Sequence, residues 1–260
     1  MALSASALTA GGTGVDATSF TTASITPTAN RLILACAHTV QSTPFVTPVV
    51  TGNGLTWVNI NTRTQGVNDH FTLFRALGAS PSAGGVTFNY TGTNIVRITW
   101  SIIEIDGVDT SGTNGSGAIV QSAVNSGDNT SNTLTVTLAS FADAVNNAAV
   151  GAFGVRSASD TLVAGTGFTF INQATIAEFS TTGTEFQLGE DTTVNASWTN
   201  NANRLGIAIE VKATAAGTNM QINIGDAWKT VSGMQINIGD TWKTVAGAQI
   251  NIGDAWKTIF

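Results

Sequence analysis

Short runs in which apolar and polar residues alternate follow one another along most of the chain. Residues 95–105 (IVRITWSIIEI) form the longest run, and residues 31–40 (RLILACAHTV) are nearly continuously apolar, as expected for a buried strand. Clusters of Gly, Asn, Asp and Ser separate the runs, and Asn53-Gly54 before residues 55–60 is a strong turn signal. A period of two between turn residues predicts β-strands.

The alternation predicts about thirteen strands before residue 214. They are residues 31–40, 55–60, 70–77, 86–90, 95–105, 118–124, 133–138, 148–155, 167–171, 175–180, 185–189, 193–198 and 204–213. Helical periodicity is nearly absent, and only residues 140–148 fit a short helical turn. Regular short strands without helices are typical of a sandwich or barrel. We therefore expect an all-β chain whose residues 1–212 form a jelly-roll or lectin-like β-sandwich of two packed sheets.

Two segments of this region resemble each other. In residues 28–37 (TANRLILACA) and residues 201–210 (NANRLGIAIE), an Asn-Arg pair stands just before an apolar strand. The first and last strands of a sandwich often close it, so we expect these two segments to be neighbours in the core.

The last forty residues repeat one phrase three times. Residues 221–231 (QINIGDAWKTV), 235–245 (QINIGDTWKTV) and 249–259 (QINIGDAWKTI) follow residues 213–219 (ATAAGTN), a stretch of small residues that reads as a linker. We therefore place three 14-residue β-hairpin repeats in residues 220–260.

Each copy alternates as two short strands around a Gly-Asp turn. A three-residue loop at residues 225–227 would pair Ile224 with Trp228 and Ile222 with Thr230, which gives the hairpin one apolar face. A lone hairpin is marginal in water, so that face needs a partner. The expected assembly residues are Ile222, Ile224, Trp228, Ile236, Ile238, Trp242, Ile250, Ile252 and Trp256.

Two other roles stay open for the repeats. Trp228, Trp242 and Trp256 could form a stacking platform for sugar rings or for another protein. Asp226, Asp240 and Asp254 are single carboxylates on turns, which are poor Ca²⁺ ligands without further oxygen donors. The glycan platform is therefore the stronger of these alternatives.

The repeat phrase I-N-I-G-D-x-W-K-x-V resembles the short hairpin repeats that end many bacteriophage virion proteins of the tail-tip, fibre and decoration types. The preceding segments, such as NRLILACAH, GNGLTWV and NRLGIAIEVK, are similar to β-sandwich proteins encoded among phage structural genes. The resemblance implies an exposed virion protein of the head-fibre, decoration or tail-fibre type. It also implies a homo-oligomer, with a trimer favoured, that contacts other virion proteins.

Charge and composition exclude several classes of partner. Only 10% of residues are charged and the net charge is −6, so a nucleic-acid partner is not expected, because phosphate binding needs clustered Lys and Arg. Cys36 is the lone cysteine, in an apolar run, and reads as a small buried hydrophobe. No signal peptide and no membrane-spanning stretch is recognised, so we expect synthesis in the host cytoplasm and residence in the virion.

The motifs of common catalytic sites are missing from the sequence. His38 and His70 stand in no metal-binding spacing, and there is no G-x-S-x-G elbow or phosphate-binding P-loop. We therefore predict a non-enzymatic structural protein with no catalytic residue, cofactor or metal. The polar loops at residues 109–117 and 125–132 are long enough to carry a sugar or Ca²⁺ site, so a carbohydrate-binding, host-receptor-binding module is the alternative.

One stretch suggests a third reading, a glycoside hydrolase. Glu104 and Asp106 lie two apart on a predicted strand and project from one face, as a pair of hydrolytic carboxylates would. The stretch resembles the E-I-D-x-x-E strand of lectin-fold β-glucanases, but Asp109 stands where the closing Glu would be, after Gly107. The simpler interpretation places Glu104 and Asp106 on the solvent face of an edge strand and its turn.

Overall fold

The chain divides into two compact units, Met1–Thr214 and Ala215–Phe260. A computed structural model describes residues 2–41, 45–157, 160–176 and 180–215, and the backbone of six short strands between residues 221 and 258. We call the first unit the body and describe each unit by itself. No helix among the described residues has the length and apolar character that crossing a membrane requires.

Sixteen strands and one 3₁₀ turn, η1 (Ser116–Ala118), make up the described body. The first half holds β1 (Ser4–Thr13), β2 (Ser19–Thr21), β3 (Leu32–Gln41), β4 (Val49–Thr51), β5 (Val58–Gln65), β6 (Asp69–Ala76), β7 (Thr87–Asn89) and β8 (Ile95–Asp106). The second half holds β9 (Ile119–Gly127), β10 (Thr133–Thr137), β11 (Ala148–Val155), β12 (Val163–Ala164), β13 (Thr169–Ile176), β14 (Ser180–Leu188), β15 (Thr193–Ser197) and β16 (Arg204–Val211).

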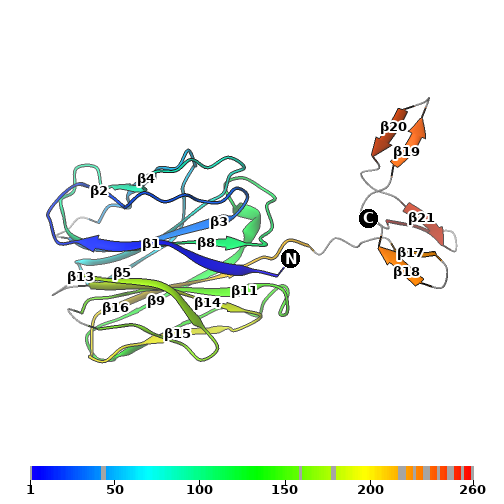
Figure 1. Ribbon diagram of the computed structural model, residues 1–260. Coiled ribbons are helices and arrows are strands. Elements are labelled where there is room, and N and C mark those ends of the chain that lie inside the picture. Colours follow the sequence, from blue (N-terminus) through cyan, green and yellow to red (C-terminus); the bar gives the residue numbers. More distant parts are fainter. Residues whose placement is uncertain are drawn as a thin grey trace. The chain divides into compact units, whose positions relative to one another are not determined.

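These strands form four antiparallel sheets stacked as layers (Figure 1). The two five-stranded inner sheets have the orders β1-β8-β3-β6-β5 and β13-β14-β11-β16-β9. The two three-stranded outer sheets have the orders β2-β7-β4 and β10-β15-β12. The all-β class predicted from the alternation is confirmed, but the body has four sheets where two were expected.

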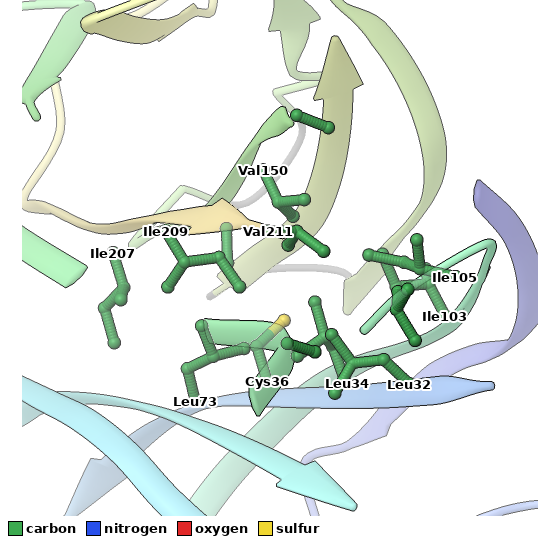
Figure 2. Close-up of a cluster of buried hydrophobic side chains, with 14 of the residues drawn as sticks. Leu32, Leu34, Cys36, Leu73, Ile103, Ile105, Val150, Ile207, Ile209 and Val211 are labelled. Carbon is green, nitrogen blue, oxygen red and sulfur yellow. The ribbon is translucent and has the colours of Figure 1, made fainter. Parts of the chain in front are cut away.

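Three apolar cores lie between these layers. Side chains of β3, β6 and β8 meet those of β11 and β16 between the inner sheets (Figure 2). The other two cores fill the space between each inner sheet and its outer sheet. Every residue of β3 is therefore buried, because apolar layers cover both of its faces. Cys36 is fully buried in the central core, as predicted, and burial raises the pKa of its thiol to about 12.

The two halves of the body have the same topology. Replacing β1–β8 by β9–β16 in order converts the first inner sheet into the second and the first outer sheet into the second. The register agrees: Glu104 pairs with Ile33 on β3, and Glu210 pairs with Ala149 on β11. With these glutamates superposed, the irregularity that skips Ile60 in β5 coincides with the one that skips Ile171 in β13. The body is thus an internal duplication.

Most predicted strands are present, and residues 148–155 coincide with β11. The predicted strand 175–180 is wrong, because β13 ends at Ile176 and β14 begins at Ser180. β1 was not predicted, since its small residues and two glycines give a weak pattern. The expected pairing of the two Asn-Arg segments is also wrong: β3 and β16 belong to different inner sheets and share only the core between them.

The second unit contains three two-stranded hairpins: β17 (Gln221–Ile224) with β18 (Ala227–Thr230), β19 (Gln235–Ile238) with β20 (Thr241–Thr244), and β21 (Gln249–Ile252) with β22 (Ala255–Thr258). Their register differs from the expected one. Asn223 pairs with Trp228, and Ile222 pairs with Lys229. Because Ile224 pairs with Ala227, the predicted Ile224–Trp228 and Ile222–Thr230 pairs are wrong. The other two hairpins repeat this register.

Candidate functional site

The carboxylates of Glu104 and Asp106 meet a single guanidinium. Arg31 Nη1 lies 2.7 Å from Glu104 Oε1, and Arg31 Nη2 lies 3.3 Å from Asp106 Oδ2. Thr28 adds two donors to Glu104, its backbone N–H at 2.9 Å and its hydroxyl at 3.1 Å. The two carboxylates therefore do share one face, and both hold the segment that leads into β3.

The position of this pair on an edge strand, which the sequence suggested, is wrong. β8 lies between β1 and β3, and Glu104 is buried. Its counterpart Glu210 has the same task in the second half: it accepts hydrogen bonds from the Ala142 N–H (2.9 Å), Asn147 Nδ2 (2.6 Å) and Gln121 Nε2 (2.7 Å). The repetition of a buried glutamate that anchors the preceding loop indicates a structural role for both residues.

Asp109, the third acid of the stretch, is held away from hydrolytic chemistry by an ion pair. Its carboxylate lies 2.8 Å from Lys212 Nζ and accepts the Ser111 N–H at 2.8 Å. The Lys212 and Ser111 hydrogen bonds lower the pKa of Asp109 to about 2. A general acid needs a raised pKa to hold its proton near neutral pH, so Asp109 is unsuited to that role.

A serine, a histidine and an aspartate lie in sequence between the two inner sheets. Ser180 Oγ is 2.6 Å from His38 Nδ1, and His38 Nε2 is 3.7 Å from Asp69 Oδ1. All three residues are almost completely buried. Ser180 also hydrogen-bonds the Thr99 hydroxyl at 2.8 Å. A nucleophile must be reachable by substrate, and this serine is enclosed by the packed sheets, so the chain joins the halves and does not form a hydrolytic site.

Asp69 extends this connection to the second half. Its Oδ2 accepts Asn203 Nδ2 at 3.0 Å and lies 3.5 Å from Arg156 Nη1. Burial tends to raise the pKa of Asp69, but the hydrogen bond from His38 and the charges of His38 and Arg156 outweigh it and lower the pKa. Asp69 is therefore a charged link between the halves.

The aromatic residues of the body offer little surface to a sugar. Trp100 and Trp198 are buried, and Trp57 is partly buried against the core of the first half, where its indole N–H donates to the Gly52 carbonyl at 3.3 Å. Tyr90 is fully buried. Sugar-binding faces stack rings on exposed aromatics, and these four side chains are committed to packing.

The two long polar loops hold themselves together. In residues 109–117, the Gly117 N–H donates to the Ser111 carbonyl at 3.1 Å, and in residues 125–132 the Thr130 hydroxyl donates to Asp128 at 2.6 Å. Within the described part of the chain, no three His, Cys, Asp or Glu side chains gather as a metal site. The contacts within these loops are those of ordinary turns.

Sequence reasoning missed Glu185, the most unusual acid in the body. It lies on β14 and is fully buried, with one carboxyl oxygen accepting the Gly165 N–H at 3.1 Å. Burial, with a smaller contribution from the negative charge of Asp191, raises the pKa of Glu185 to about 8. In the sequence it stands in an ordinary alternating run, EFQLG, which gives no signal that this carboxylate faces a core.

The predicted assembly residues all lie on β17 to β22. The backbone places each tryptophan opposite an asparagine: Trp228 opposite Asn223, Trp242 opposite Asn237 and Trp256 opposite Asn251. The side chains of these residues, and Asp226, Asp240 and Asp254, lie outside the described part of the structure. No protein family, curated protein or solved structure significantly matches the chain.

Proposed function

We propose that the protein is a non-enzymatic structural component of a phage virion, an exposed fibre or decoration protein. The four-layered body would be its rigid external module, and the three hairpins would join copies to one another or dock the body to the particle. The observation that carries the proposal is the threefold repetition of one hairpin after a body that is complete in its own cores.

The physics of a hairpin supports an assembly role. Each repeat has two four-residue strands, and among the described strands each pairs only within its own hairpin. A two-stranded sheet of this size is marginally stable in water and gains stability when a further surface covers it. Covering three copies together, or the repeats of several chains, would supply that surface.

The body supports the proposal through the occupation of its polar groups. Glu104 and Glu210 anchor loops, and the Ser180–His38–Asp69 chain joins the halves. We also propose that each half is a jelly roll, because a strand order of 1-8-3-6 beside 2-7-4 is the one that two Greek keys generate in an eight-stranded sandwich. Jelly rolls are common in viral capsid proteins.

Incorporation into particles tests this role. The full chain and a version ending at Thr214 would each be expressed with a fluorescent label during particle assembly, and the particles separated on a density gradient. We expect the full chain to sediment with particles and the shortened chain to stay with soluble protein. Equal incorporation of the two versions would contradict docking through the repeats.

Glycan binding is the second candidate, and its support is the three tryptophans of the repeats, since those of the body are committed to packing or partly buried. Titration of tryptophan fluorescence with a panel of host-surface polysaccharides would separate the two roles. A saturable change in the full chain that is lost on truncation at Thr214 would favour glycan binding. A flat response would favour assembly alone.

A further inference from the structure

We propose that Glu185, Gln187 and the turn at residues 165–168 form a binding site for a hard divalent cation, Ca²⁺ above all, with Asp191 at its rim. The inference is independent of the virion role. It rests on oxygen atoms that are buried without a hydrogen-bond partner, on their convergence at one turn, and on a comparison between the two halves.

The two side chains reach the same turn. Glu185 and Gln187 are two residues apart on β14, so they project from one face of the strand. Glu185 Oε2 accepts the Gly165 N–H, and the turn is closed by the Phe168 N–H donating to the Gly165 carbonyl at 3.0 Å. A Cβ atom on Gly167 would lie 2.6 Å from Gln187 Oε1, so only glycine leaves room for that oxygen.

Each side chain brings an oxygen that lacks a partner. Glu185 Oε1 and Gln187 Oε1 are both buried without a hydrogen bond to any described residue. Leaving such acceptors unpaired costs about 1–3 kcal/mol each, and more for a charged group. A buried orphan oxygen therefore indicates a ligand, a bound water or, for Glu185, a proton.

The first half of the body shows what the site replaces. In the duplicated register, Glu185 corresponds to Phe74 and Gln187 to Ala76, because Ile33 pairs with Ala76 and its counterpart Ala149 pairs with Gln187. Phe74 and Ala76 are both buried, and Phe74 belongs to the apolar core of the first half. The same fold is thus stable with apolar residues at these positions, and the second half has two oxygen donors instead.

The donor set suits calcium. Ca²⁺ binds carboxylate, amide and backbone carbonyl oxygens, with water completing a coordination number of six to eight. Glu185 and Gln187 supply one oxygen of each of the first two kinds. Asp191, partly exposed and close enough to act electrostatically on Glu185, adds negative charge beside the site. Mg²⁺ prefers rigid octahedral geometry and gives up its water reluctantly, so a site with two side-chain oxygens favours Ca²⁺.

Binding would displace the proton of Glu185. With a pKa of about 8, the carboxyl is about nine-tenths protonated at pH 7, and a cation binds only the ionised form. Association therefore releases about 0.9 of a proton per cation at pH 7. For the same reason, the apparent affinity for Ca²⁺ rises about tenfold between pH 6 and pH 7.

Titration calorimetry of the full chain with CaCl₂, in buffers of different ionisation enthalpy, tests the proposal. We expect saturable binding at one site per chain, with a proton release that the buffer series reveals. Thermal unfolding should shift upward with Ca²⁺ relative to EDTA. Mg²⁺ should produce a smaller shift.

Variants assign the effect to the site. Glu185→Gln keeps the shape of the side chain and should abolish the Ca²⁺-dependent shift and the proton release. Asp16→Asn removes an exposed acid elsewhere and should leave both unchanged. Absence of Ca²⁺ binding by the unmodified protein, or full binding by Glu185→Gln, would overturn the proposal and leave Glu185 as a neutral buried acid. If Glu185→Gln does not fold, the pH dependence of the unmodified protein decides, because pH-independent Ca²⁺ affinity contradicts the site.

Discussion

Gly154 lies directly against His38, and the two residues occupy equivalent positions in the duplicated halves. A Cβ on Gly154 would be 2.9 Å from His38 Cγ and 2.9 Å from Phe71 Cδ2. The equivalence follows from the register, since each residue is five positions beyond the partner of an anchoring glutamate, Ile33 or Ala149. One half therefore supplies an imidazole at this point of the central core, and the other supplies the space for it.

Substituting Gly154 by alanine should destabilise the body by about 1–3 kcal/mol, because the new methyl group has no room beside two rings. Urea unfolding followed by tryptophan fluorescence would measure the change in the free energy of unfolding. Gly14→Ala is the matched control, since a Cβ there meets no atom within 4 Å. We expect the control to change stability by less than about 1 kcal/mol. Equal stability of the two variants would contradict the close packing of the halves at His38.

Replacing Glu210 by alanine should cost more stability than replacing an exposed acid. Three donors, from Ala142, Asn147 and Gln121, would lose their acceptor, and unpaired buried donors cost about 1–3 kcal/mol each. Glu104→Ala should have a similar effect, while the exposed control Asp16→Asn should have almost none. Thermal unfolding of the three variants measures this. A Glu104→Ala protein as stable as the control would contradict the anchoring role.

Glu185 should make the stability of the metal-free protein fall with rising pH. Its pKa is raised from 4.5 to about 8 in the folded state, so between these values the folded chain binds the proton more tightly than the unfolded chain does. The stabilisation is complete below about pH 4.5 and is lost as the pH rises through about 8, with a slope of up to about 1.4 kcal/mol per pH unit.

Urea unfolding in EDTA from pH 5 to pH 9 measures that slope. Glu185→Gln cannot ionise, so its stability should lack this part of the pH dependence, and the two curves should diverge as the pH rises. Parallel curves across the whole range would show that the carboxyl of Glu185 does not keep its proton on folding.

The all-β class was predictable because strand alternation and turn residues are local signals. The number of layers was not inferred, although one clue was present: the continuous apolar run of β3 is what a strand covered on both faces requires. The duplication was hidden because the halves share topology and register with little sequence. The likeness of residues 28–37 to 201–210 misled, since the structural counterpart of β3 is β11.

The candidate site shows the same division between local and long-range information. Spacing placed Glu104 and Asp106 on one face, but their role depends on Thr28 and Arg31, more than seventy residues away in the chain. Glu185 became visible only when burial was known. The hairpin register depended on a loop length that the Gly-Asp sequence alone did not fix.

The most direct measurement of the central claim is the solution mass of the full chain and of a chain ending at Thr214, by sedimentation equilibrium at matched concentrations. The account predicts a mass that is a small multiple of the 26.6 kDa chain for the full protein, and a folded monomer for the shortened one. The same oligomeric state for both chains would contradict assembly through the hairpin repeats.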